Sequence, residues 1–140
     1  MTMKLTEHFT LEELTKSTTA TAHGYANTPN ADQIYNLRIL CERVLEPARL
    51  KIGKPIVITS GFRSDTVNKL VGGVANSWHR YGQACDIHVN SKAEADELAH
   101  ACLESELCDK CIYERKGKSQ WLHVQWGYNA RHNYCSIIKP

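Results

Sequence analysis

Apolar residues recur at helical spacing between residues 30 and 50, which predicts the main core helix. The positions that would share one buried face are Ile34, Leu37, Cys41, Val44, Leu45 and Ala48. Asn30 followed by Gln33 is the pattern of a capping box, so this helix should begin just after Asn30. Pro47 lies inside the pattern and predicts a kink or an end near Glu46.

Capping patterns predict shorter helices elsewhere in the chain. The segment Thr10–Glu13 reads as a capping box, so a helix should begin at about Leu11 and fray within residues 17–21. Two further helices are expected to begin after Ser64 and after Ser91.

Four short segments have the composition of strands: Pro55–Thr59, Ala84–Val89, Cys111–Glu114 and Gln120–Trp126. A polar loop of hairpin length that contains glycine separates the last two, so they should pair antiparallel. These elements predict an α+β fold with an antiparallel sheet and helices packed around it.

Length and charge narrow the function classes. A chain of 140 residues suits one domain, 1–140, and a net charge of +2 is too mild for a nucleic-acid binder. The opening Met1–His8 has no apolar run, and no later stretch is long and apolar enough to span a membrane. We therefore expect a monomer that is cytoplasmic as synthesised, without nucleic-acid partners.

The six cysteines are expected to be free, buried thiols, because several fall on predicted apolar faces. Cys108 and Cys111 have the Cys-x-x-Cys spacing of a zinc or redox site. With only Cys135 downstream, the ligands are too few for a structural zinc, and no helix start is predicted there to activate a thiol. A redox pair is kept as an alternative.

Three side chains have the chemistry of an open zinc site. His79 lies in a predicted loop, Asp86 follows seven residues later in a strand, and Gly82 lets the chain turn back between them. His123, in a distant strand, is the best third ligand, because catalytic zinc takes three protein ligands and leaves a fourth position open. Such a site would activate water for hydrolysis.

Two residues extend this hypothesis. Strand alternation puts His88 on the same face as Asp86, so His88 could rival His79 as a ligand or support the ligands from behind. Hydrolysis also needs a general base, and Glu114 ends the strand expected to pair with the His123 strand.

At these residues the sequence resembles the zinc D-Ala-D-Ala carboxypeptidase family, whose fold is shared with the Hedgehog signalling domain and the vancomycin-resistance dipeptidases. The matching positions are Ser77, His79, Gly82, Ala84 and Asp86, preceded by Ser60-Gly-Phe-Arg-Ser64 and Asn68–Gly73 and followed by Trp121-Leu-His123. The opening Leu5–Leu14 is similar to the small phage and prophage branch.

The resemblance implies that His79, Asp86 and His123 bind Zn²⁺. It also implies that Arg63 takes part at the substrate, against a carbonyl or carboxylate, and that Ser77 lines the same pocket.

For the base, several family members carry an acidic residue three positions before the last zinc histidine. Here that position is Gln120, which cannot accept a proton but is expected beside the substrate. The Hedgehog-like arrangement, in which a Tyr-Glu pair ends the preceding strand, is similar to Tyr113-Glu114 and nominates Glu114.

The resemblance therefore implies a zinc metallopeptidase that cleaves the stem peptide of bacterial peptidoglycan, as a carboxypeptidase or an endopeptidase. We expect it to serve in phage lysis or entry and to act on the cell wall after release. The alternative, which Gln120 favours, is a non-catalytic, zinc-stabilised module that binds wall peptide without cutting it or serves as a phage structural component.

Overall fold

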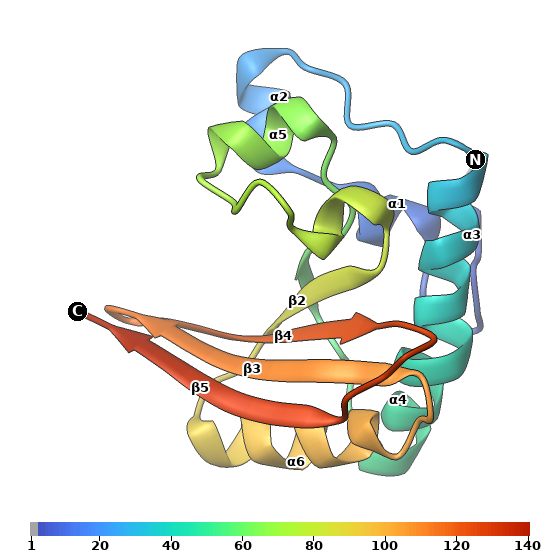
Figure 1. Ribbon diagram of the computed structural model, residues 1–140, viewed down its shortest axis with the longest axis vertical. Helices are drawn as coiled ribbons and strands as arrows, with labels where there is room; N and C mark the ends of the chain where they lie inside the picture. The colour runs from blue at the N-terminus through green and yellow to red at the C-terminus, as the bar shows by residue number, and fades with distance from the viewer. Residues whose placement is uncertain (1–2) are drawn as a thin grey trace.

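The protein, described over residues 3–140 by a computed structural model, folds helices around a five-stranded sheet (Figure 1). The helices are α1 (Leu11–Thr15), α2 (Thr18–His23), α3 (Ala31–Leu40), the π-helix η1 (Cys41–Leu45), α4 (Glu46–Ile52), α5 (Asp65–Leu70), the 3-10 helix η2 (Trp78–Tyr81) and α6 (Lys92–Leu103). The strands are β1 (Ile58–Ser60), β2 (Ala84–His88), β3 (Cys108–Lys116), β4 (Ser119–Trp126) and β5 (Asn133–Lys139). The α+β class predicted from the sequence is confirmed.

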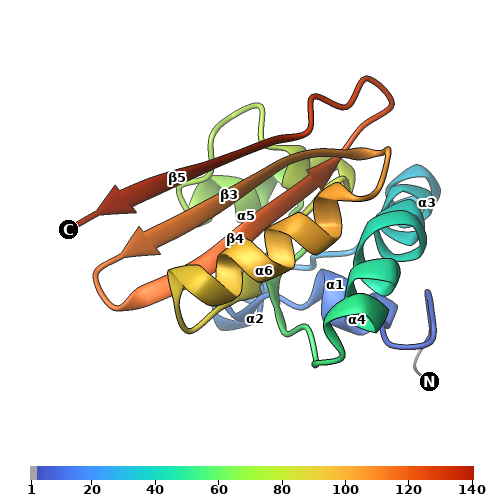
Figure 2. The same cartoon turned by 90° about the horizontal axis from the view of Figure 1, so that it is seen from below.

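The sheet separates two different environments. Its strand order is β1-β2-β4-β3-β5, and α6 lies across one face while α5 and η2 lie on the other side (Figures 1 and 2). Because side chains alternate along a strand, Tyr113 and Leu122 point toward α6 and are buried there, whereas His123 points to the opposite face. Each fully buried leucine of that core contributes about 1.5–3 kcal/mol. The core on the α6 side therefore supports the strands that carry the polar face.

The edge strand β5 was not predicted. It pairs in parallel with β3, from Lys110 opposite Asn133 to Lys116 opposite Lys139, so the otherwise antiparallel sheet gains one parallel pair. Most of its side chains are exposed, as at an edge, and the alternation of apolar residues that marks a half-buried strand is therefore weak.

The first helical region differs from expectation beyond Thr15. The Thr10–Glu13 capping box is present and α1 begins at Leu11, as predicted. The expected fraying over residues 17–21 is wrong, because Ser17 caps a second helix, α2, that ends at Gly24 in the left-handed conformation. Threonine is a weak helix former, but a hydroxyl cap and a C-terminal glycine outweigh that weakness here.

The main core helix begins at its predicted cap, where Asn30 and Gln33 form a reciprocal capping box. The expected kink or end at Glu46 is instead a wide π turn, in which Glu46 N–H donates to the carbonyl of Cys41 and the helix continues as α4. The wide turn stands directly before Pro47, whose ring would clash with a carbonyl in a regular α-helix.

The other predictions about helices and strands are partly confirmed. Ser64 and Ser91 cap α5 and α6 as expected, and the β3–β4 hairpin is confirmed. The strand expected over Pro55–Thr59 is shorter and shifted, because only Ile58–Ser60 pairs with β2. Within residues 3–140 every helix is too short or too polar to cross a membrane. Met1 and Thr2, which belong to the N-terminal segment considered above, lie outside the described residues.

All six cysteines fall within the described residues and are free. Five are buried as expected and Cys135 is exposed. Cys108 and Cys111 enter β3 with their sulfurs 3.7 Å apart. Their mutual hydrogen bond and burial raise the pKa of the Cys108 thiol far above its usual range, which leaves little thiolate for redox chemistry.

Gly61, in the segment after β1, packs directly on the backbone of α1. The amide of Phe62 donates to the carbonyl of Leu14 at 2.7 Å, and a Cβ on Gly61 would overlap that same carbonyl oxygen. Only glycine fits without moving one of the two segments. This contact fixes the position of the Gly61 carbonyl.

Gly61→Ala is expected to lower the free energy of unfolding by about 1–3 kcal/mol, the usual effect of forcing extra volume into a packed site. Urea unfolding followed by circular dichroism measures it. Gly127→Ala is the matched control, because its Cβ would lie 3.2 Å from the Trp78 ring and needs only a small adjustment. Equal stability of Gly61→Ala and the native protein would contradict the packing account.

Candidate metal centre

The pairing of β2 with β4 places Asp86 directly opposite His123. Both side chains point to the face of the sheet away from α6, because they lie between core residues on their strands. Asp86 Oδ1 lies 3.1 Å from His123 Nδ1. Two residues far apart in the chain are thus brought together by strand register.

His79 reaches the same point from η2. Ser77 caps this 3-10 turn by accepting from the His79 amide, and Gly82 ends it in the left-handed conformation at φ 76°, from which the chain enters β2. His79 Nε2 lies 3.4 Å from Asp86 Oδ1. One donor atom from each of His79, Asp86 and His123 lies within 4.8 Å of the others, and the sequence prediction that these residues converge is therefore met geometrically.

The donor set fits Zn²⁺. The Nδ1 of His79 donates to the Gly61 carbonyl at 2.8 Å, which leaves its Nε2 lone pair facing Asp86. The Nε2 of His123 lies 2.7 Å from Gln125 Oε1, which leaves Nδ1 facing Asp86. Imidazoles whose outer nitrogens are bonded to oxygen acceptors, together with one carboxylate, are the usual surroundings of zinc in proteins.

The electrostatics favour an ionised Asp86. Burial raises the pKa of this carboxyl, but hydrogen bonds and charge from His79 and His123 outweigh burial, so the pKa lies well below its usual range. Burial lowers the pKa of His123, while Asp86 and the more distant Glu114 raise it, and the net pKa is raised. The carboxylate is therefore available as a ligand at neutral pH.

Arg63 completes the inner wall. Its NH2 lies 3.3 Å from Asp86 Oδ2, its Nε donates to Ser60 Oγ at 3.1 Å, and its NH1 donates to Asn68 Oδ1 at 3.4 Å. Burial lowers the pKa of Arg63, against the opposing charges of Asp86 and Glu114. Of the five guanidinium N–H groups, two remain free for a further acceptor after these contacts.

These residues line one cleft of about 520 Å³ between the sheet and the segment from α5 to η2. Ser77, Arg63 and Glu114 all line it together with the three candidate ligands. Glu114 is held by the indole of Trp121, whose Nε1 donates to Glu114 Oε2 at 3.1 Å. The sequence-predicted base therefore shares a cleft with the candidate metal ligands.

Two predicted residues are not brought to this cleft. Gln120 lies on the α6 face of the sheet, where it accepts from the hydroxyl of Tyr113 and donates to the carbonyl of Asn90 at 3.2 Å. His88 is exposed at the end of β2, with Nε2 3.0 Å from Asn90 Oδ1, and is outside the three-residue cluster. Gln120 lies on the α6 face because side chains alternate along β4. His88 shares the face of Asp86, but its position further along β2 keeps it out of the cluster.

The sequence was also compared with known proteins. A sequence profile of the family described as Peptidase M15 matches residues 7–125, which is most of the chain. The chain belongs to the peptidase M15 family. The resemblance drawn from the sequence motifs is therefore confirmed at the level of the family.

Among curated proteins, this M15 chain is similar to the zinc D-Ala-D-Ala carboxypeptidase of Streptomyces albus G. The two are 51% identical over 39 residues, which is 28% of this chain and 15% of the relative. The chain thus matches only a small part of that relative's length.

Sequence reasoning missed two residues behind the M15 cluster, Gln125 and Asp109, and it assigned no role to Asn68, which opens the family-like segment Asn68–Gly73. Gln125 follows His123 by two positions, so strand alternation alone could have placed it on the same face. Asp109 has no such signal, because it reaches that face through an irregularity in the pairing of β3 with β4.

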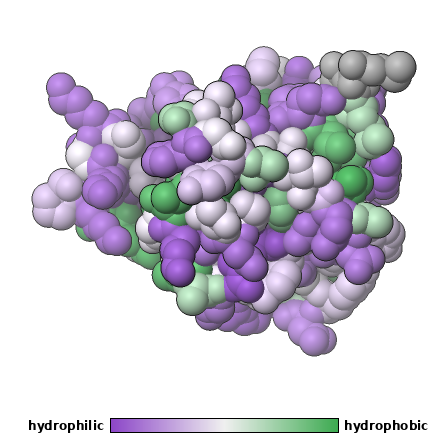
Figure 3. All heavy atoms as spheres, turned by 90° about the horizontal axis from the view of Figure 1, so that it is seen from above, coloured by the Kyte–Doolittle hydropathy of each residue, from purple (hydrophilic) through white to green (hydrophobic). Residues whose placement is uncertain are grey.

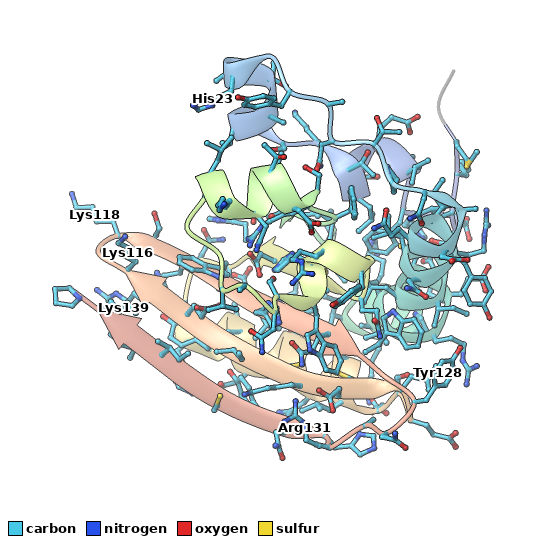
Figure 4. All side chains as sticks on the ribbon, turned by 45° about the horizontal axis from the view of Figure 1, so that its top comes forward. His23, Lys116, Lys118, Tyr128, Arg131 and Lys139 are labelled. Atoms are coloured by element: carbon cyan, nitrogen blue, oxygen red, sulfur yellow. The ribbon has the colours of Figure 1, made fainter. Side chains whose placement is uncertain are left out.

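Seen from above, most of the visible surface is hydrophilic or near neutral, with smaller apolar areas (Figure 3). Lys116, Lys118 and Lys139 gather at the hairpin end of the sheet, far from Tyr128 at the opposite end (Figure 4). Lys139 lines the cleft together with Lys110.

The M15 chain is expected to hold one Zn²⁺ per chain and to lose it on His123→Ala, because two ligands cannot retain a catalytic zinc. Metal content after dialysis, measured by plasma mass spectrometry, tests this. His88→Ala is the matched control on the neighbouring strand and should keep its zinc. Zinc retained by His123→Ala, or lost from His88→Ala, would contradict the assignment.

Proposed function

We propose that the chain is a zinc peptidase that hydrolyses peptide bonds in the stem peptide of bacterial peptidoglycan, with His79, Asp86 and His123 as zinc ligands. The observation that carries the proposal is the convergence of these three donors within 4.8 Å on the wall of an open cleft. Membership of the peptidase M15 family supports it independently.

A zinc ion held by His79, Asp86 and His123 would lower the pKa of a water molecule and polarise a scissile carbonyl. The chain itself must then supply a group that takes the proton. Glu114 is the carboxylate in the cleft besides Asp86, and its link to the Trp121 indole keeps its orientation. In the proposal, a Glu114 carboxylate oxygen accepts the proton from the attacking water and passes it to the leaving amine.

Arg63 and Ser77 are proposed to hold the substrate. The guanidinium is fixed by Ser60, Asn68 and Asp86, so it presents its remaining N–H groups without a large loss of side-chain freedom. A planar, permanently charged donor suits a peptide carboxylate or carbonyl.

The charge of the cleft favours an acidic peptide. Lys110 and Lys139 line its outer part, and neither has a carboxylate partner among the ion pairs of residues 3–140. The curated relative is named a D-Ala-D-Ala carboxypeptidase, and a carboxypeptidase acts at a peptide end that carries a free carboxylate. Carboxypeptidase and endopeptidase action are both compatible with an open cleft, and the products distinguish them.

Glu114→Gln is expected to lower the hydrolysis rate by about 100- to 10,000-fold, the usual contribution of a general base. Glutamine keeps the oxygen that accepts from Trp121, so zinc content and fold should not change. Mass spectrometry of defined muropeptides, with and without a chelator, gives both the rate and the bond that is cut.

Glu97→Gln, on the exposed side of α6, is the control for that experiment and should hydrolyse normally. Unchanged activity of Glu114→Gln would remove Glu114 from the mechanism. A native protein that keeps zinc and binds the muropeptides but forms no products would instead be a binding module.

Arg63→Lys is expected to raise KM while changing kcat little, because lysine cannot make the several contacts of the guanidinium. A lost charge-assisted hydrogen bond of about 1.5–3 kcal/mol corresponds to roughly 10- to 150-fold in kcat/KM. Steady-state kinetics on a muropeptide measure this, with zinc content checked in parallel. Arg115→Lys, at an exposed position of β3, is the control, and equal kinetics for both variants would contradict the role.

A further inference from the structure

We propose that Asp109, acting through Gln125, selects which ring nitrogen of His123 is free to bind the metal. Asp109 and Gln125 are thus positioning residues for the candidate zinc ligand. The inference rests on the proposed zinc site, but it concerns residues that have no place in the proposed reaction.

Asp109 is buried and accepts every hydrogen bond that reaches it. Its Oδ2 accepts from Gln125 Nε2 at 2.9 Å and from Arg131 NH2 at 2.8 Å, and its Oδ1 accepts from Arg131 N at 2.9 Å and Nε at 3.1 Å. These contacts with Arg131 outweigh burial and lower the pKa of Asp109 to about 2. An ionised carboxylate can only accept hydrogen bonds.

The acceptor character of Asp109 orients the amide of Gln125. The NH₂ group must face the carboxylate, so Oε1 faces the other way, where it lies 2.7 Å from His123 Nε2. An amide oxygen is also only an acceptor, and Nε2 must therefore carry the proton. In the neutral ring this leaves the lone pair on Nδ1, the nitrogen that faces Asp86 at 3.1 Å.

The strand geometry places this series of contacts in the wall of the cleft. Gln125 lies two residues after His123 and so shares its face of β4, while the shifted pairing between Cys108 and Lys110 brings Asp109 to that face. Arg131 comes from the segment between β4 and β5 and is the outermost residue of this series of contacts, at the surface (Figure 4).

The other histidine is oriented differently. His79 donates through Nδ1 to the backbone carbonyl of Gly61, which no side-chain substitution can reverse. Of the two histidines, only His123 has a tautomer that depends on a side-chain amide, that of Gln125, which can flip. Asp109 prevents this flip. The two ligands should therefore respond differently to substitutions behind the site.

Asp109→Asn tests the inference with almost no change of shape. An amide at position 109 can donate to Gln125 Oε1, so the Gln125 side chain can turn and present NH₂ to His123 Nε2. That orientation favours the wrong tautomer, and zinc affinity should fall about 10- to 100-fold, as for other groups that orient metal ligands. Competition with a chromophoric chelator measures the affinity of folded protein.

Arg131→Ala is the matched control, since it breaks the same ion pair but keeps the acceptor. Gln125 should then stay in place and the loss of zinc affinity should be much smaller than for Asp109→Asn. If the two variants lose zinc affinity equally, the ion pair acts through general stability and the inference is overturned.

Gln125→Met supplies a second, independent variant of similar shape without the acceptor, and it should weaken zinc binding on its own. Because Asp109 acts only through Gln125, adding Asp109→Asn to Gln125→Met should cause no further loss of affinity. Additive losses in the double variant would overturn the inference.

Nitrogen NMR of the zinc-loaded protein tests directly which ring nitrogen of His123 carries the proton. In the native protein Nε2–H of His123 should be seen and should exchange slowly with solvent, and this signal should be lost or exchange faster in Asp109→Asn. A native protein that binds no zinc would reject the proposed zinc site, whereas native zinc binding with an unaffected Asp109→Asn would reject the positioning role alone.

Discussion

The site depends on one constraint, the antiparallel register between β2 and β4. That register places Asp86 opposite His123, and every other feature of the site adds to this pair. A slip of β4 by one residue against β2 would turn His123 toward α6, away from Asp86, and bring the core residues of β4 into the cleft. The apolar neighbours on the same strands, such as Leu122 and Val124, oppose that slip because it would expose them. The residues that build the core therefore also specify the geometry of the polar cluster.

The cluster gathers groups that are costly to bury together. A carboxylate, two imidazoles and a guanidinium lie within one wall, and each is hydrogen-bonded to a group that is itself fixed. Part of this support is backbone, since the Gly61 carbonyl is held by the close packing of its segment on α1. The rest is side chain, through Gln125 and Asp109. Rigid support of this kind is what allows ligand atoms to stay in place before a metal arrives.

Much of the fold could be predicted because its signals are local. Hydroxyl and amide caps at Thr10, Asn30, Ser64 and Ser91 start helices wherever they occur, and the ligand motif puts its chemistry in a few consecutive residues. Two of the failures depend on strand pairing and not on the local sequence: β5 pairs with the edge of β3, and Asp109 reaches the cleft face only through shifted pairing. The third is local, because Pro47 signals a disturbance near Glu46 without distinguishing a π turn from a kink or an end. None of these leaves a periodic pattern in the sequence.

Strand geometry also limits which positions can place a proton acceptor in the cleft. Position 120 precedes His123 by three residues, and in the regular strand β4 an odd separation puts the two side chains on opposite faces. An acidic residue at Gln120 would therefore face α6 in this chain and could not serve the cleft. The position that does face the cleft comes from the neighbouring strand, where Glu114 pairs with Trp121, two residues from His123 and on the same face. The absence of an acid at position 120 is thus no argument against hydrolysis, because the sheet presents a carboxylate from β3 instead.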